Sequence, residues 1–409
     1  MPDSRLEAFL AGEKALSSKL PPQGSSSTMA PLTNTQVPLA FASCSIGCKP
    51  SHTLPKKLQA IASAGFTAIE LSMPDIVAFA NLHLRPHKQG DTASDSFGPR
   101  DYDDLAEAAK VIRTQCDAQG LKILILQPFA NFEGWPADSP ERRDAFERLA
   151  GWMRIMEAAG TDMLQVGSSD SPAEKIGTDR ERFVSDLREL ADRLATKGFR
   201  CAYENWCWST HAPDWKDVWD ICRRVDRENF GLCLDTFQYA SIPPLLPPPN
   251  EFKPNPISPP PPRSAGGEYA DPTTPSGLLS DGRDASQLQA SWLASCQTLA
   301  STIPASKIFF LQISDAYRMD PPLEDKADSN GMRPRARWSS AYRPLPYQGY
   351  LPCADFARAV LQTGFRGYFS YEVFDQGPDG KGKDYEMGEF AREAMGTQER
   401  LLRECEEGS

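Results

Sequence analysis

Short apolar runs recur along the chain, and longer segments with the helical spacing of apolar residues separate them. Near-continuous apolar runs of this kind are typical of strands that are covered on both faces. Alternating strands and helices indicate repeated βα units, so eight runs predict an α/β fold of the (β/α)8 TIM-barrel type. An open doubly wound sheet is the alternative architecture. The eight runs are residues 39–46, 67–72, 122–129, 163–168, 200–205, 230–237, 307–314 and 367–374.

Three segments interrupt this rhythm. Residues 1–36 are rich in Ser, Pro, Gly and Thr, with too little apolar surface to offset the entropy of ordering, so we expect a flexible N-terminal extension. The barrel then occupies residues 37–409, with a Pro-rich insertion at 241–284 after the sixth strand. A long aromatic and basic loop, 315–350, follows the seventh strand. Loops that follow barrel strands form the active-site face, so this loop is a candidate lid or substrate wall.

Composition narrows the class of partner. The chain of 409 residues has a net charge of −11 and a pI near 5.1, so its overall field repels phosphate backbones and anionic membranes. We therefore expect a small-molecule substrate and neither nucleic acid nor a membrane as partner. The sequence contains no apolar run of the ~18 residues that cross a bilayer and no secretory signal pattern, which indicates a cytoplasmic protein. The ten cysteines include no CxxC pair, which argues against a zinc knot.

Four apolar runs in the second half of the chain end in a side chain with a hard oxygen donor. Strand ends of a barrel converge on one mouth, so these side chains should meet there. An acidic residue inside an apolar run is costly unless it is paired or bound to a cation. Carboxylate and amide oxygens suit one Mg²⁺ or Mn²⁺ ion, with Co²⁺ as a further option, whereas zinc prefers His and Cys. The four predicted metal ligands are Glu204, Asp235, Gln312 and Glu372.

Other polar residues near strand ends are candidates for proton transfer and substrate binding. Glu70 ends the second run, where burial and neighbouring carboxylates would raise the pKa of a carboxyl group and a metal ion would lower it. His211, seven residues after Glu204, either transfers protons or only orients a ligand. Gln127 and Gln165, at the ends of the third and fourth runs, are candidates to bind substrate hydroxyls or to anchor loops.

Several motifs along residues 38–375 carry a resemblance to a known family. They include GFTAIEL (65–71), ILQPFANFEGW (125–135), AYENWCW (202–208), LDTFQYA (234–240) and RARWSSAYR (335–343). In order and spacing they are similar to the xylose-isomerase-like barrels of sugar phosphate isomerases and epimerases, and within these to fungal and bacterial 3-dehydroshikimate dehydratases. The resemblance implies a divalent metal held by the same four strand-end residues.

The resemblance also implies substrate-binding residues, with some departures from the family pattern. WSSAYR is similar to a WSRNxR motif whose Ser and last Arg bind substrate, which implies Ser339 and Arg343 here, and a guanidinium suits a substrate carboxylate. Ala130 stands where bacterial members have Arg, and Gln238 stands where they have His. Gln cannot accept a proton at neutral pH, so Gln238 is a candidate for binding rather than for proton transfer. Ser340 and Ala341 replace the Arg-Asn pair of the motif.

The expected activity is therefore dehydration of 3-dehydroshikimate to protocatechuate, a step of quinate catabolism. The metal would stabilise the enolate that forms when Glu70 or His211 removes the α-proton. The same groups with proton return in place of water loss would make a sugar or sugar phosphate isomerase or epimerase, which is the alternative. A third hypothesis is a binding protein that kept the barrel and lost its chemistry. An endonuclease of this fold would need more histidines than the four present.

Overall fold

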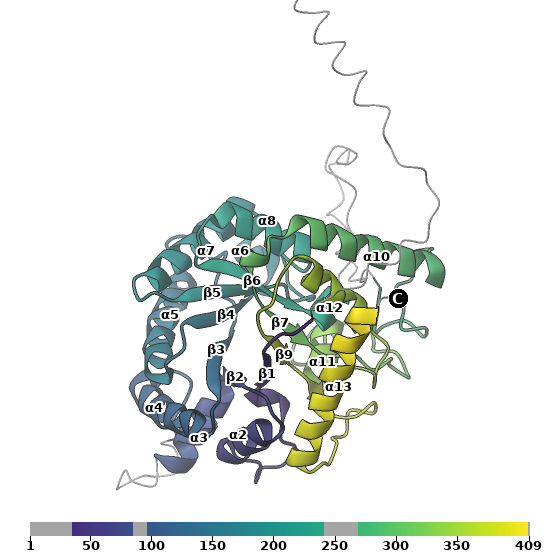
Figure 1. Cartoon of the computed structure of the whole chain (residues 1–409). Coiled ribbons are helices and arrows are strands. Elements are labelled where there is room, and N and C mark those ends of the chain that lie inside the picture. Colours follow the sequence, from purple (N-terminus) through teal and green to yellow (C-terminus); the bar gives the residue numbers. More distant parts are fainter. Residues whose placement is uncertain (1–34, 85–95, 241–268, 408–409) are drawn as a thin grey trace, which may run out of the picture.

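Eight parallel strands close into one barrel, and helices form a ring around it (Figure 1). The computed structural model describes residues 35–84, 96–240 and 269–407. Around the barrel the strands follow their sequence order, so the predicted TIM barrel is confirmed and the open-sheet alternative is wrong. The strands are β1 (Leu39–Ala42), β2 (Ala68–Ser72), β3 (Lys122–Phe129), β4 (Met163–Gly167), β5 (Arg200–Glu204), β6 (Phe230–Asp235), β7 (Ile308–Ile313) and β9 (Phe369–Tyr371).

The helices begin and end at residues whose local chemistry explains the boundary. The Ser139 hydroxyl accepts a hydrogen bond from the Arg142 N–H at the start of α5, and Gly160 ends this helix with a left-handed φ of 72°. Asp284 and Gln287 form a reciprocal capping box at the start of α10. The longer helices are α2 (Leu54–Ser63), α3 (Met73–His83), α4 (Tyr102–Ala118), α5 (Pro140–Ala159), α7 (Arg180–Ala195), α8 (Trp215–Val225), α10 (Ala285–Thr302), α12 (Cys353–Gln362) and α13 (Met387–Glu407). Shorter helices are α6 (Ala173–Ile176), α9 (Thr236–Ala240) and α11 (Pro334–Ala341).

The inside of the barrel has an apolar floor below a polar layer. The floor includes Ala40, Ala68, Ile125, Met163, Ala202, Cys233 and Phe310, which form a buried cluster separate from the larger core between strands and helices. Alternate side chains of a strand point to the same face, so residues two positions further along each strand also point inward. These are Ala42, Glu70, Gln127, Gln165, Glu204, Asp235 and Gln312. The strand register therefore brings polar side chains together at the carboxyl ends of most strands.

The long connection after β7 contains regular structure that the sequence did not predict. It includes α11 and then β8 (Tyr342–Arg343), which pairs antiparallel with β10 (Phe374–Asp375), so that Arg343 lies opposite Phe374. The Arg333 guanidinium ties this connection to the loop after β5, donating to the Trp208 carbonyl at 2.6 Å and to the Thr210 hydroxyl at 2.9 Å. The connection is therefore anchored at the carboxyl end of the barrel, and its role as a lid or substrate wall stays a prediction.

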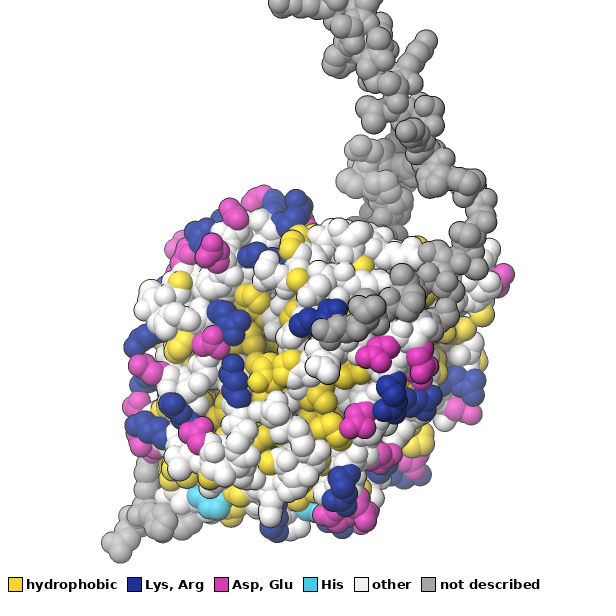
Figure 2. All heavy atoms as spheres, in the orientation of Figure 1, with side chains coloured by type: hydrophobic (Ala, Val, Ile, Leu, Met, Phe, Trp, Pro, Cys, Tyr) yellow, Lys and Arg dark blue, Asp and Glu magenta, His cyan; other side chains and the backbone are white. Residues whose placement is uncertain are grey.

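Other predicted features are only partly covered by the described residues. The predicted N-terminal extension lies outside them up to residue 34, and so do residues 241–268 of the Pro-rich insertion. Its remaining part, 269–284, includes a β-bridge between Ala270 and Leu278. Within the described ranges, the helices are too short or too polar for any of them to span a lipid bilayer. In the view of Figure 2, side chains of both charges are mixed around the face, and hydrophobic ones gather near its middle.

Candidate metal centre and its surroundings

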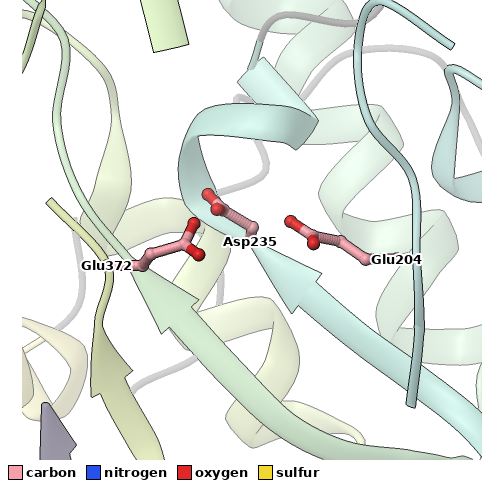
Figure 3. A group of neighbouring side chains, drawn as sticks. All are labelled: Glu204, Asp235 and Glu372. Carbon is pink, nitrogen blue, oxygen red and sulfur yellow. The ribbon is translucent and has the colours of Figure 1, made fainter. Parts of the chain in front are cut away.

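Three carboxylates from separate strands meet at the carboxyl end of the barrel (Figure 3). Glu204 ends β5, Asp235 ends β6, and Glu372 follows β9 directly. One oxygen of each lies within 4.8 Å of the others, and all three side chains are buried. The structure therefore brings together the three acidic residues among the predicted ligands.

Burial makes these carboxylates hard to ionise. It raises the pKa of Glu204 well above its usual value, and repulsion from Glu372 adds to the effect. The pKa of Glu372 is raised to about 7, mainly by burial, although Arg343 acts in the opposite direction. Burial also raises the pKa of Asp235. A cluster of this kind needs cations to keep its carboxylates charged.

Arg343 is a cation already present at the cluster. Its guanidinium donates to Asp235 Oδ2 at 2.5 Å and to Glu372 Oε2 at 2.9 Å, and its Nε donates to the Ser314 hydroxyl at 2.8 Å. Burial lowers the pKa of Arg343, but Asp235 and Glu372 outweigh this effect and raise it. Three carboxylates and one guanidinium carry a charge of −2 when ionised, which one divalent cation would balance.

Unpartnered oxygens around the cluster also fit a cation. Among the residues that the structure describes, the buried Oε1 atoms of Glu204, Gln165 and Glu70 have no hydrogen-bond partner. Buried oxygens usually have a partner, and a bound cation would satisfy several of these atoms at once. Oxygen donors of carboxylate and amide type match the preference of Mg²⁺ and Mn²⁺. The donor set therefore fits the divalent ion that the sequence predicted.

Gln312, the fourth predicted ligand, lies beside the cluster on β7. Its Nε2 donates to Glu70 Oε2 at 2.7 Å, and its Oε1 accepts a weak hydrogen bond from the Cys233 thiol at 3.2 Å. Burial raises the pKa of Glu70 to about 8, and repulsion from Glu372 adds to the shift. Glu70 and Gln312 thus form a pair at the edge of the carboxylate cluster.

Two other glutamines contact the carboxylates directly. Gln127 Nε2 donates to Glu372 Oε1 at 3.4 Å, and Gln165 Nε2 donates to Glu204 Oε2. Both glutamines are almost fully buried. Their amides therefore hold Glu372 and Glu204 in place from the neighbouring strands.

The remaining predicted site residues have other contacts. His211 Nε2 lies 2.8 Å from Glu133 Oε1, and its ring stacks on Phe183 with centroids 3.9 Å apart. Gln238 Oε1 accepts a hydrogen bond from the Cys207 backbone N–H at 2.9 Å, so it joins α9 to the loop after β5. The Ser339 hydroxyl accepts a hydrogen bond from Arg343 at 3.4 Å. The structure thus brings Ser339 to the cluster through Arg343 and pairs His211 with Glu133.

Sequence reasoning missed Trp206 as a neighbour of the cluster. Its indole Nε1 donates to Glu204 Oε2 at 3.0 Å. The ring lies against Gly167, where a Cβ atom would be only 2.1 Å from an indole carbon, so this close approach requires glycine. The signal was available in AYENWCW, where the Trp stands two positions after the predicted ligand.

The chain matches the family model described as "Xylose isomerase-like TIM barrel" over residues 58–395. It belongs to this family. Over 351 residues it is 34% identical to the 3-dehydroshikimate dehydratase of Neurospora crassa, covering 83% of this chain and 86% of that protein. It is 29% identical to the 3-dehydroshikimate dehydratase of Pseudomonas aeruginosa, covering 80% of this chain but only 37% of that longer protein.

Solved structures share the fold at lower identity. A fusion protein of a xylose isomerase-like TIM barrel and a 4-hydroxyphenylpyruvate dioxygenase aligns with a TM-score of 0.60 at 24% identity. The alignment covers 91% of this chain and 44% of that one. This similarity shows the fold alone. The family match and the curated relatives make the chain a xylose isomerase-like barrel that resembles the dehydratases, and it contains a buried carboxylate cluster with the donors for a metal site.

Proposed function

We propose that the chain is a divalent-metal-dependent hydro-lyase that dehydrates 3-dehydroshikimate to protocatechuate. The 34% identity to the Neurospora crassa dehydratase over most of both chains is the observation that carries this proposal. The buried cluster of Glu204, Asp235 and Glu372 supports it, because the reaction needs negative charge to be stabilised on a carbonyl oxygen. A small anionic ring acid is then the substrate, and Mg²⁺ or Mn²⁺ is the proposed ion, with Co²⁺ as a further option.

The proposed ligands are the three carboxylates and Gln312. When bound, a divalent ion would act as a Lewis acid toward the substrate carbonyl. Arg343 holds Asp235 and Glu372 in place through its two ion pairs and opposes the rise that burial causes in their pKa values. A forked contact from Arg343 to a substrate carboxylate would require one of these pairs to be released, since Nε already binds Ser314.

Glu70 is the proposed base. It is fully buried, its Oε1 has no partner among the described residues, and Gln312 holds its Oε2. A carboxylate in such a setting is a stronger base than one in water. It would take the proton from the carbon next to the ketone and return it to the departing hydroxyl group. Water is thereby lost, and the remaining ring tautomerises to the aromatic product without any oxidant.

The other predicted site residues have more limited proposed roles. Gln127, Gln165 and Ser339 would bind substrate hydroxyl or carboxylate groups from their positions beside the cluster. Gln238 would shape the pocket through its bond to the Cys207 backbone. His211 is not proposed as the base, because its Nε2 is bound to Glu133.

The direct test is an assay of the purified protein with Mn²⁺ and 3-dehydroshikimate, following the ultraviolet absorbance of the aromatic product. Glu70→Gln preserves size and should reduce kcat by about 10²-fold or more, as expected on removal of a general base. The exposed Glu107→Gln is the matched control and should retain wild-type activity. No aromatic product from the wild-type protein with either Mg²⁺ or Mn²⁺ would refute the dehydratase proposal.

A metal-dependent isomerase or epimerase is the second candidate. It is favoured by Ala130 and Gln238, which replace the Arg and His that the sequence comparison with bacterial dehydratases led us to expect. Either reaction would begin with the same proton removal. Incubating the protein in D₂O with hydroxy ketones separates them, because an epimerase exchanges the α-hydrogen for deuterium without losing water.

A further inference from the structure

Glu133 is a fully buried carboxylate that gathers three donors on one oxygen. Its Oε1 accepts from the Ser169 backbone N–H at 2.8 Å and from the Tyr203 hydroxyl at 2.9 Å. His211 Nε2 lies 2.8 Å from the same oxygen. Glu133 itself lies in the loop after β3, and the donors come from the loop after β4, from β5 and from the loop after β5. One side chain therefore joins three successive βα units at their carboxyl ends.

These contacts keep Glu133 charged in spite of its burial. Burial acts to raise its pKa, but the hydrogen bonds from His211 and the Ser169 backbone outweigh this and lower it. Hydrogen bonds to a charged acceptor are stronger than bonds between neutral groups. The junction of Glu133 with Ser169, Tyr203 and His211 is therefore held by stronger hydrogen bonds than a neutral acceptor would form.

Two routes lead from this junction to Glu204. Tyr203 and Glu204 are successive residues of β5 and point to opposite faces, so the contact of the Tyr203 hydroxyl on the outer face helps to hold the backbone from which Glu204 points inward. The second route begins at Ser168 and Ala212, the chain neighbours of Ser169 and His211. The Ser168 hydroxyl accepts from the Trp206 backbone N–H at 2.9 Å and donates to the Ala212 carbonyl at 3.0 Å. Trp206 then donates its indole N–H to Glu204 at 3.0 Å.

We propose that Glu133, with His211 as its partner, is a positioning residue that orients Glu204 for binding the divalent cation. The inference rests on the metal centre of the proposed function. Glu133 acts through β5 and Trp206, not through contact with the ion. Partners that orient a metal ligand typically contribute a factor of about 10–100 to metal affinity. His211, which stood among the candidate bases, thus takes a role in metal affinity and not in proton transfer.

Calorimetric titration with Mn²⁺, carried out well below the melting temperature, measures the Mn²⁺ affinity and so tests this role without any assay of activity. Glu133→Gln and His211→Leu should each weaken Mn²⁺ binding by about 10–100-fold. His211→Gln retains an N–H donor toward Glu133 and should stay within roughly threefold of the wild type, below the 10–100-fold loss expected for the other two variants.

Asp186→Asn is the matched control. Asp186 is also a buried carboxylate, and it accepts from Arg142 at 3.0 Å and from the N–H of Gly134, the residue after Glu133, at 2.9 Å, but neither hydrogen bond reaches β5. The Asp186→Asn variant should have a lower melting temperature, but its Mn²⁺ affinity should stay within roughly threefold of the wild type because Asp186 does not orient a metal ligand.

The outcomes separate this inference from the proposed function. Wild-type Mn²⁺ affinity in both Glu133→Gln and His211→Leu would overturn the positioning role alone. An equal loss of affinity in Asp186→Asn would overturn it as well, because the effect would then be general destabilisation. If Glu133→Gln does not fold, the contrast between His211→Leu and His211→Gln decides the question. A wild-type protein that binds no Mn²⁺ would overturn the proposed function together with this inference.

Discussion

The metal-free protein should become less stable as the pH rises from 5 to 8, and Glu70 should cause part of this loss. The pKa of Glu70 is about 8 in the folded chain, against a usual value of 4.5. Between these values the folded state holds a proton that the unfolded state has released. The contribution of Glu70 to the free energy of unfolding is therefore fully present below pH 4.5 and is lost progressively up to about pH 8.

The size of the effect follows from the shift. Each pH unit within this window costs about 1.4 kcal/mol for one fully protonated group, so three units set an upper limit of about 4 kcal/mol. Glu70 shares its environment with Glu372, whose pKa is also raised, to about 7. Removal of one carboxyl group also removes its repulsion of the other. We therefore expect Glu70→Gln to reduce the loss of unfolding free energy between pH 5 and pH 8 by roughly 2–4 kcal/mol.

Urea denaturation in EDTA at pH 5, 6, 7 and 8, followed by tryptophan fluorescence, measures the loss. The exposed Glu107→Gln is the control and should follow the wild-type pH dependence. Mn²⁺ should stabilise the protein increasingly as the pH rises, because it binds the ionised carboxylates. Equal pH dependence in the wild type and Glu70→Gln, or stability that rises from pH 5 to 8 in EDTA, would refute the argument.

Three further predictions follow from the site and the chain ends. Glu204→Ala or Glu372→Ala should abolish Mn²⁺ uptake while the fold survives, and wild-type Mn²⁺ content in the folded variants would contradict the ligand assignment. Arg343→Ala should cost about 2–4 kcal/mol in kcat/KM for an anionic substrate. Arg343→Lys should not restore the activity, since an ammonium group lacks the two parallel N–H donors of a guanidinium. Activity of Arg343→Ala within a few-fold of the wild type would exclude a role of Arg343 in substrate binding. A chain that starts at Met29 should keep its melting temperature, because it retains Thr35, which donates to Glu406; a drop of more than a few degrees would show that the removed segment packs on the barrel.

The strand pattern and the strand-end acids could be read from the sequence because both depend on local order. A strand buried on both faces must be apolar throughout, so Glu204 and Asp235 stood out as polar ends of apolar runs. The alternation of side chains then put Glu70 on the same inner face as these residues. Little information beyond the strands themselves was needed for this part of the site.

The contacts made by loops could not be read in the same way. Arg343 and Asp235 are separated by 108 positions, and their ion pair depends on the short β8–β10 pairing, which leaves no periodic pattern in two-residue strands. His211 follows its strand by seven residues, so its direction depends on where the loop turns. Its pairing with Glu133 could be found only once the loops after β3 and β5 had been placed side by side.

The two inner layers of the barrel, the apolar floor and the polar layer above it, have opposite effects on the stability of the fold. The apolar floor favours folding, whereas the carboxylates two positions above it disfavour folding until a cation is bound. Substituting a residue of the polar layer therefore changes the chemistry while the floor residue of the same strand is kept. Replacing a metal ligand by an apolar residue should also make the metal-free protein more resistant to unfolding. Such a barrel can exchange one reaction for another in evolution without rebuilding the part that holds it together.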